Sequence, residues 1–332
     1  MSEKRAVKPL SAVDEEENRF LLNRWFRKFF KLDIENIGLY IVFFIVVVFF
    51  SVASPYFLTA RNIFDILRQS TFILTAALGA TLIILTAGID LSVGAVLGLS
   101  AGVTSILLLQ GLPTPIAIMG GVSTGALCGL INGMIITKLG VTDFIATLAT
   151  LSVFRGILFM MTQGVPFAAF ARPSFSFLGR GNVGPVPVPV IISLVIFLIL
   201  HYLLVKTPFG RHILAVGSNR EAARLSGIRV KKVKIFVYII GGIMAAVSGI
   251  MLAARLSSVP PDLGTGYELS VIASVVIGGT SLFGGRGSVL GTIMGALLVA
   301  VIANGLILLN VNPFYQYVIN GILIVIAVAL KK

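Results

Sequence analysis

The polar side chains that lie within or beside the apolar runs of this chain are the candidates for a functional site: Asp90, Ser92, Asn132, Arg155, Tyr267, Glu268 and Asn304. Among the charged groups near these runs, Asp90, Asp143 and Arg155, none is paired at catalytic spacing. The single cysteine and the two histidines have no further ligand at metal-binding spacing. We therefore expect no catalytic residue, no metal site and no cofactor in this chain, and interpret the seven residues as candidates that line a polar path.

Each of these residues also has a simpler structural interpretation. Asp90 lies between two apolar runs, where its carboxylate could cap the second helix. Thr265 and Glu268 have capping-box spacing. Arg155 is deep within an apolar run, and a lipid-facing arginine there costs about 2.5–3.5 kcal/mol, so it must face protein or water. A fixed interhelical hydrogen bond is the plainer interpretation of Arg155, and lining of a path is the alternative.

The elements that position these residues must be membrane-spanning helices. The chain has 332 residues, of which 57% are hydrophobic, 12% are charged and 35 are glycine. A soluble domain carries roughly 25% charged residues, so a soluble globular protein is excluded. At about 20 apolar residues per span, the sequence predicts an all-α polytopic domain over residues 37–332. It has about ten transmembrane helices, at 37–53, 72–88, 91–109, 115–136, 144–162, 188–205, 233–254, 269–283, 289–309 and 315–330.

The net charge of +13 is explained by topology and does not require a nucleic-acid partner. If both termini are cytoplasmic, the inner segments hold 20 of the 26 Lys and Arg residues and the outer segments hold five. Residues 1–36 form a cytoplasmic N-terminal segment. Within it, 20–32 mixes aromatic and basic residues, which favours an amphipathic helix in the headgroup layer over a disordered basic tail.

Three short likenesses relate the two halves of the domain. Asp90-Leu91-Ser92-Val93-Gly94 matches residues 262–266, Asn132-Gly133 matches Asn304-Gly305, and residues 140–144 resemble 310–314. The offset is 172 residues for the first two and 170 for the third, which is five spans in the ten-span arrangement. An odd number of spans turns matching elements to opposite sides of the membrane. The sequence therefore predicts an inverted internal repeat, which is common in transporters.

The longest internal hydrophilic stretch, residues 206–234, predicts a short isolated helix. Asn219 can cap its start, residues 220–226 continue it, and Gly227 can close it in the left-handed conformation. About eight residues are too few for a stable free helix. We expect this segment to be held by another surface.

The motif Glu221-Ala222-Ala223-Arg224-Leu225-Ser226-Gly227 resembles the E-A-A-x-x-x-G loop of importer permeases in the ATP-binding cassette class. With the preceding residues 210–219, it is similar to that of the ribose/xylose/galactose-type sugar permeases. The resemblance implies that 206–234 is a cytoplasmic coupling loop that docks on an ATPase. The coupling residues would be Asn219, Arg220, Glu221, Ala222, Ala223, Arg224 and Gly227.

Further matches to this family spread over residues 57–330. They are the runs at 88–94, 144–148, 265–269, 278–281 and 284–287. One position departs from the pattern: where the family commonly reads E-L-D after the tyrosine, this chain has Glu268-Leu269-Ser270. No role of that carboxylate is carried over to Ser270.

The resemblance implies a permease subunit of a bacterial inner-membrane importer that translocates a monosaccharide and performs no covalent chemistry. Its expected partners are a second permease copy, an ATPase with tandem nucleotide-binding domains that holds the ATP and magnesium, and a periplasmic-type sugar-binding protein. The alternatives are a secondary carrier or channel for a small polar solute, and a membrane-embedded enzyme. The scarcity of buried charge disfavours a carrier, because ion-driven carriers need an intramembrane group that binds the ion.

Overall fold

The computed structural model describes residues 37–168 and 172–312, together with 314–315, 318–319, 321–322 and 325. The amphipathic helix expected at 20–32 lies outside the described residues, as does most of the span expected at 315–330. Residues 39–332 form one unit, and the contacts described below belong to it. Its elements are α2 (Ile37–Ala53), α3 (Ala60–Leu85), α4 (Val93–Leu109), α5 (Thr114–Lys138), α6 (Asp143–Thr162), β1 (Phe167–Ala168), α7 (Pro173–Arg180), β2 (Asn182–Val183), β3 (Val186–Pro187), α8 (Val188–Lys206), α9 (Pro208–Ser218), α10 (Arg220–Leu225), α11 (Val230–Leu256), β4 (Ser258–Val259), α12 (Tyr267–Ile277) and α13 (Val289–Leu308).

The predicted all-helical, polytopic class is confirmed. Within the described part of the chain, six helices are long and apolar enough to cross a membrane: α3, α5, α6, α8, α11 and α13. Three shorter apolar helices, α2, α4 and α12, coincide with other predicted spans. The number of crossings, about ten, and the inverted repeat stay predictions.

Two predicted boundaries are wrong. Helix α3 begins at Ala60 and not at residue 72. Thr59 caps its start by accepting from the backbone N–H of Asn62, and the Asn62 side chain in its first turn has a buried partner in Asn304. Helix α12 ends at Ile277 and not at residue 283, since Gly278 and Gly279 close it and a turn-rich segment follows.

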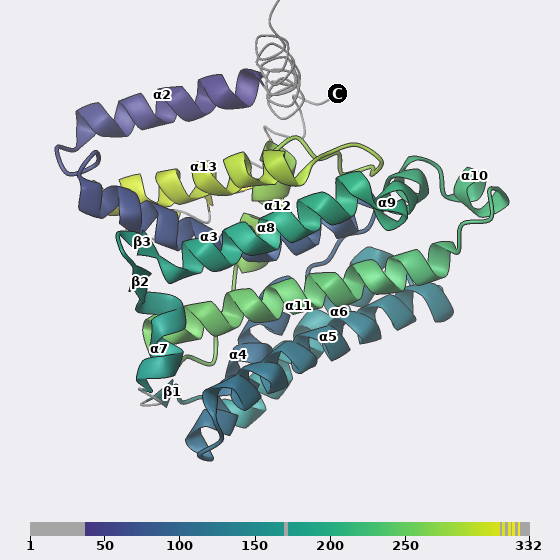
Figure 1. Cartoon of the computed structure of the whole chain (residues 1–332), viewed down its shortest axis with the longest axis horizontal. Coiled ribbons are helices and arrows are strands. Elements are labelled where there is room, and N and C mark those ends of the chain that lie inside the picture. Colours follow the sequence, from purple (N-terminus) through teal and green to yellow (C-terminus); the bar gives the residue numbers. More distant parts are fainter. Residues whose placement is uncertain are drawn as a thin grey trace, which may run out of the picture. The chain divides into compact units, whose positions relative to one another are not determined.

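Helix α11 occupies the centre of the unit, between α3 on one side and α4 and α5 on the other (Figure 1). Small residues permit the close approach: a methyl group on Gly125 of α5 would collide with the backbone carbonyl of Gly242 in α11, and one on Gly129 with that of Tyr238. Such contacts stabilise helix pairs in lipid, where association gains nothing from the hydrophobic effect.

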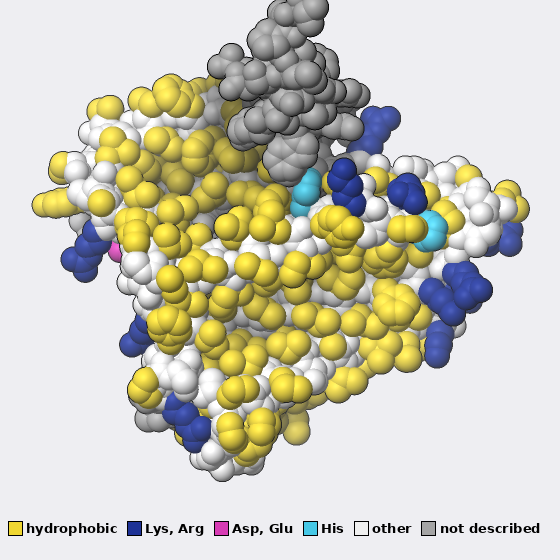
Figure 2. All heavy atoms as spheres, viewed as in Figure 1, with side chains coloured by type: hydrophobic (Ala, Val, Ile, Leu, Met, Phe, Trp, Pro, Cys, Tyr) yellow, Lys and Arg dark blue, Asp and Glu magenta, His cyan; other side chains and the backbone are white. Residues whose placement is uncertain are grey.

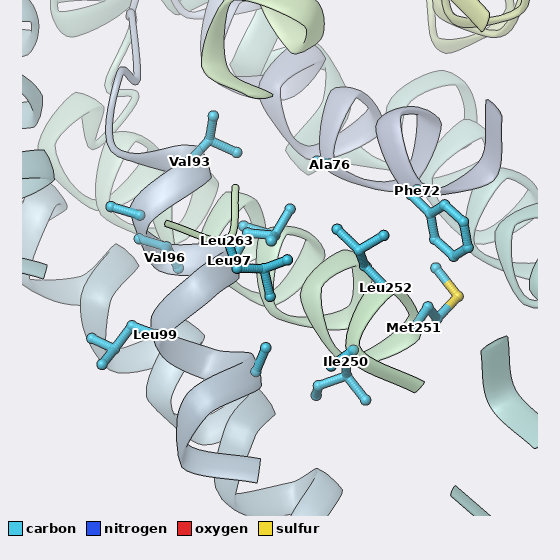
Figure 3. Packing of buried hydrophobic residues seen from close by; sticks show 14 of the residues in the cluster. Phe72, Ala76, Val93, Val96, Leu97, Leu99, Ile250, Met251, Leu252 and Leu263 are labelled. Carbon is cyan, nitrogen blue, oxygen red and sulfur yellow. The ribbon is translucent and has the colours of Figure 1, made fainter. Parts of the chain in front are cut away.

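The apolar core joins α3, α4 and α11. Phe72 and Ala76 of α3, Val96 of α4 and Met251 of α11 belong to one buried cluster, which Leu263 of the α11–α12 connection completes (Figure 3). On the outer surface, hydrophobic side chains cover the middle of the visible face, whereas Lys and Arg gather at its two ends (Figure 2). This distribution suits a belt of lipid between two aqueous faces.

The strands are short, and their pairing joins segments of the loops between helices. Strand β1 pairs antiparallel with β4, with Phe167 opposite Val259, and β2 pairs with β3 in a hairpin, with Asn182 opposite Pro187. The longer connections that matter for the site are the breaks between α3 and α4 and between α11 and α12, each of which ends a long helix and starts a short one.

Candidate functional site

Three of the seven path candidates meet in one buried hydrogen-bonded chain at the start of α4. The Asp90 carboxylate accepts from the backbone N–H of Ser92 (2.8 Å) and from its hydroxyl (2.7 Å). The Ser92 hydroxyl oxygen accepts from the Asn132 side-chain amide of α5 (2.8 Å), and the Asn132 carbonyl oxygen accepts from Thr150 of α6 (2.7 Å). All four residues are buried. The break between α3 and α4 is thus tied to α5 and α6.

The expected capping role of Asp90 holds in part. Its carboxylate binds an N–H group at the beginning of α4, as predicted, but the residue at the cap position is Ser92. A second tie supports the same break: the Thr147 hydroxyl of α6 accepts from the backbone N–H of Leu91 at 3.2 Å, and its own proton has alternative acceptors, including the carbonyls of Asp143 (2.8 Å) and Ile89 (3.2 Å).

Asn304 lies in a different place and binds a different partner. It donates to the side-chain oxygen of Asn62 (2.9 Å), and Asn62 donates back to Asn304 (3.0 Å) and to the carbonyl of Phe57 (2.9 Å). Both asparagines are buried, and the pair joins α13 to the first turn of α3. Because the two asparagine side chains bond to each other, the pair fits a structural link between α13 and α3 better than the lining of an open path.

Arg155 makes the interhelical contact that was the plainer interpretation. Its Nη1 donates to the backbone carbonyl of Leu263 at 2.6 Å, from mid-α6 to the break before α12, and the side chain is half-buried. The carboxylates of Asp262 and Glu268 are close enough to interact with it electrostatically. Arg155 therefore holds the second break, as Asn132 and Thr147 hold the first.

Glu268 does not form the predicted capping box with Thr265. The cap of α12 is Gly266, whose φ of +78° suits glycine, and Glu268 Oε1 accepts from the N–H of Gly266 (3.2 Å). The other oxygen, Oε2, is buried against Gly94 of α4 with no hydrogen-bond partner among the described residues. Glu268 thus sits where the two short helices begin.

Tyr267 lines a small cavity of about 140 Å³ between α3, α12 and α13. Gln69, Thr265 and Ser270 give this cavity its polar wall, and Val299 and Ile302 its apolar wall. Tyr267 is therefore separate from the Asp90, Ser92 and Asn132 chain. The seven candidates fall into four groups rather than one site.

The structure of residues 219–227 matches the prediction in detail. The Asn219 side chain accepts from the N–H groups of Glu221 (3.0 Å) and Ala222 (2.9 Å) and caps α10. At the other end Gly227 has a φ of +82°, its N–H binds the carbonyl of Arg224, and the N–H of Ile228 binds that of Ala223. This pair of bonds is a Schellman motif.

The surroundings of α10 show what holds it. Only Ala223 is buried, in a cluster with residues of α9 and α11, while Arg220, Glu221, Ala222, Arg224 and Leu225 are exposed. Glu221 and Arg224 form an exposed ion pair at 2.5 Å. The Arg224 guanidinium, and to a smaller degree Arg220, lowers the pKa of the Glu221 carboxyl from its ordinary value. The preformed outer surface of α10 therefore carries an acidic group, Glu221, a basic group, Arg224, and an exposed apolar side chain, Leu225.

The stretch before α10 was expected to be a loop, and it is helix α9. Thr207 caps it by accepting from the N–H of Gly210 (3.2 Å). Ile213 and Val216 bury its inner face. Pro208 at the first turn and the apolar spacing of Ile213 and Val216 were available signals for this helix.

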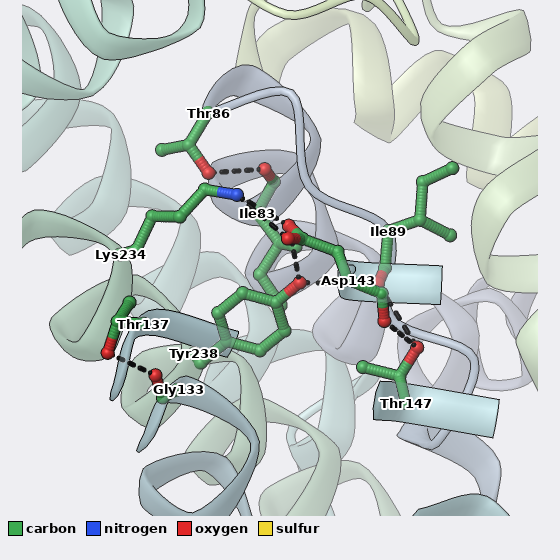
Figure 4. Close-up of polar contacts among 9 residues, drawn as sticks. All are labelled: Ile83, Thr86, Ile89, Gly133, Thr137, Asp143, Thr147, Lys234 and Tyr238. Carbon is green, nitrogen blue, oxygen red and sulfur yellow. Dashed lines mark hydrogen bonds and ion pairs between the residues drawn. The ribbon is translucent and has the colours of Figure 1, made fainter. Parts of the chain in front are cut away.

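The sequence interpretation missed a largely buried ion pair between α6 and α11, the helix that follows α10. Lys234 of α11 donates to both carboxylate oxygens of Asp143, the first residue of α6, at 2.6 and 3.0 Å (Figure 4). The hydroxyl of Tyr238, one turn later in α11, lies within hydrogen-bonding distance of two acceptors, Asp143 Oδ2 at 3.1 Å and the carbonyl oxygen of Ile89 at 3.2 Å. A charge at the start of each of two predicted spans was a visible signal. Their pairing across 91 positions was not.

The chain matches the family model described as "Branched-chain amino acid transport system / permease component" over residues 62–328. It is 45% identical to the ribose import permease protein of Bacillus subtilis, over 90% of this chain and 93% of the relative. It is 41% identical to the D-allose transport system permease protein of Escherichia coli, over 91% and 93%. It is 32% identical to the xylose transport system permease protein of Haemophilus influenzae, over 90% and 97%. No solved structure gives a significant match.

Proposed function

Because the chain belongs to the family of transport-system permease components that includes the ribose, allose and xylose permeases, we propose that it is the membrane-spanning subunit of an ATP-binding cassette importer for a monosaccharide. Such a subunit moves its solute without covalent chemistry. ATP and magnesium would be bound by a separate ATPase, and an external binding protein would deliver the sugar.

The observation that carries this proposal is helix α10. It is capped at both ends, anchored through Ala223 and exposed along the rest of its surface, as a helix must be that docks on a partner. Its six residues are too few to be stable without such support. We propose that Asn219, Arg220, Glu221, Ala222, Ala223, Arg224 and Gly227 form the contact with the ATPase on the cytoplasmic side, consistent with cytoplasmic N- and C-termini.

The second part of the proposal is the inverted repeat. In each half a long helix, α3 or α11, is followed by a break with a D-L-x-x-G motif and then by a short apolar helix, α4 or α12. The next helix, α5 or α13, carries the matching asparagine, Asn132 or Asn304. Two halves in opposite orientation would let the path open alternately to either side. Two copies of this chain would then complete the pore.

The path itself would pass the two breaks. Asp90, Ser92 and Asn132 hold one break, and Arg155 and Glu268 lie at the other. Tyr267 lines the cavity beside α12. These groups offer hydrogen-bond donors and acceptors, which suits a hydroxyl-rich solute. A secondary carrier is the alternative, and it would need no ATPase.

The proposal is tested by reconstituting the complex that the tagged chain forms with its ATPase into vesicles, and measuring uptake of labelled ribose, allose and xylose with the binding protein present. Uptake of at least one sugar should require ATP and be lost in Glu221→Arg. The matched control is Arg61→Gln, a charge change on an exposed residue in the first turn of α3. Uptake that persists without ATP, or that Glu221→Arg leaves intact, would support the carrier instead.

A further inference from the structure

We propose that the ion pair of Lys234 and Asp143 is the link through which the coupling helix acts on the break between α3 and α4, so that both are positioning residues for transport. The inference rests on the proposed function and extends it from the surface of α10 to the interior. No feature of the family resemblance marks either residue.

The first step of the link is covalent and short. Helix α10 ends at Leu225, the turn at Gly227 follows, and α11 begins at Val230. Lys234 therefore lies in the second turn of α11. A displacement of α10 is therefore transmitted to Lys234 through the turn at Gly227 and the first turn of α11.

The second step is the pair itself. The Lys234 side chain is 7% exposed and that of Asp143 is 17% exposed, and the ammonium binds both carboxylate oxygens. A buried pair with two short bonds holds its partners firmly, because separating them would leave a desolvated charge. Helix α6, which begins at Asp143, must follow α11 unless the pair opens.

The third step leads to the candidate path. The Tyr238 hydroxyl is fully buried and lies within bonding distance of Asp143 and of the Ile89 carbonyl. Because one hydroxyl has one proton, it donates to only one of these oxygens at a time. Ile89 directly precedes Asp90, which begins the chain to Ser92 and Asn132. Two discrete bonding states of Tyr238 are therefore available at the break.

A cavity gives the pair room to rearrange. Its volume is about 720 Å³, and its walls are the α3 end at Thr86 and Ala87, the α5–α6 connection at 139–144, and the α9–α10 junction at 216–220. Lys138, Lys231 and Arg220 line it beside Lys234, and Asp143 is the only acidic side chain among the described residues that line it. Water in this cavity could solvate an opened pair. Movement of the α9–α10 junction would change the cavity directly.

The test uses the reconstituted complex with the full chain, its ATPase and the binding protein. Asp143→Asn and Lys234→Met each remove one charge, and the double variant Asp143→Lys with Lys234→Asp restores a pair of opposite polarity. We expect each single variant to lower sugar transported per ATP hydrolysed about tenfold, and the reversal to recover most of it. The matched control is Asp65→Asn, which removes the more exposed pair with Arg68 at 3.8 Å.

A second readout separates a link from a merely structural pair. With Cys128→Ala as background, a cysteine introduced by Val141→Cys reports on the cavity, and its modification rate by a charged thiol reagent is measured with and without ATP. The rate should depend on ATP in the wild-type pair and in the reversed pair, and not in Asp143→Asn. Tyr238→Phe should weaken this dependence with Lys234 still paired.

The outcomes distinguish the inference from the function on which it rests. If wild type transports sugar with ATP, and the single variants keep both full coupling and the ATP-dependent change in labelling, the link is wrong and the proposed function stands. The link is equally wrong if the single variants assemble and lose coupling but the reversed pair recovers neither readout. If wild type shows no ATP-dependent uptake with any tested sugar, the function itself fails.

Discussion

Gly94 of α4 and Gly264 of the α11–α12 connection lie in direct backbone contact, each so placed that a methyl group on it would collide with the carbonyl oxygen of the other. The contact joins the two D-L-x-x-G motifs, because Gly94 ends the first and Gly264 lies within the second. The two short helices thus begin side by side, and Glu268 Oε2 packs against Gly94. The two halves of the chain meet where their helices are broken.

Replacing Gly94 by alanine should therefore destabilise the protein. The added methyl group would collide with the backbone carbonyl of Gly264 as well as with the Glu268 carboxylate, and such overpacking costs about 1–3 kcal/mol. The matched change is Gly156→Ala in α6, where no atom lies within 4 Å of the added carbon. We expect a lower thermal transition for Gly94→Ala in detergent and an unchanged or higher one for Gly156→Ala. Equal transitions for both variants would contradict the close contact.

Removing one member of the Asn62–Asn304 pair should also be costly. Asn304→Ala removes the donor to the buried side-chain oxygen of Asn62, and an unsatisfied buried polar group costs about 1–3 kcal/mol. Asn182→Ala, which removes an exposed bond from Arg68, should cost less than about 0.5 kcal/mol. The free energy of unfolding of both variants is measured in mixed micelles. A loss of stability in Asn182→Ala as large as that in Asn304→Ala would contradict a stabilising role of the buried pair.

The cap of α10 can be tested with a change that leaves the helix residues 220–225 intact. Asn219→Ala removes the acceptor for two N–H groups, at a cost of about 1 kcal/mol to the helix, whereas Asn219→Asp keeps an acceptor. We expect Asn219→Ala to weaken binding of the ATPase several-fold, measured by titration of the purified subunits, and Asn219→Asp to bind as wild type does. Unchanged binding by Asn219→Ala would mean that α10 need not be preformed.

The Glu221–Arg224 pair makes a prediction about pH. Arg224 lowers the pKa of the Glu221 carboxyl in the folded chain below its ordinary value of 4.5. The ion pair is therefore fully formed at every pH above about 4.5, and it is lost only when the pH falls through the lowered pKa. Binding of the ATPase should therefore stay constant between pH 8 and about 5 as far as this pair is concerned. Glu221→Gln should bind more weakly throughout that range, and its difference from wild type should disappear below the folded pKa. A difference that changes between pH 6 and 8 would assign the effect to another group.

The sequence alone predicted the elements that depend on local signals. Apolar runs placed nine helices of the described chain, and Asn219 and Gly227 predicted both ends of α10 because each acts on its own neighbours in sequence. The start of α3 was missed for the opposite reason. Its polar first turns look like a loop until Asn304, 242 positions away, supplies the partner for Asn62.

The candidate site shows the same division. Composition and position identified Asp90, Asn132 and Arg155 as unusual polar residues in apolar surroundings, and each has a definite partner in the structure. Which partner, and whether the residues meet, depends on helix packing that no local pattern encodes. The pair of Lys234 and Asp143 was missed because a single charge at the end of an apolar span is ordinary and does not indicate its partner.

The central claim, that this chain works with an ATPase through α10, is tested most directly by isolating the tagged chain from native membranes. Wild type and Glu221→Arg are purified side by side, and co-purifying proteins are identified by mass spectrometry. The account predicts an ATP-binding cassette protein with wild type and not with Glu221→Arg. The chain alone in both preparations, in a detergent that preserves other such complexes, would contradict it and favour the carrier.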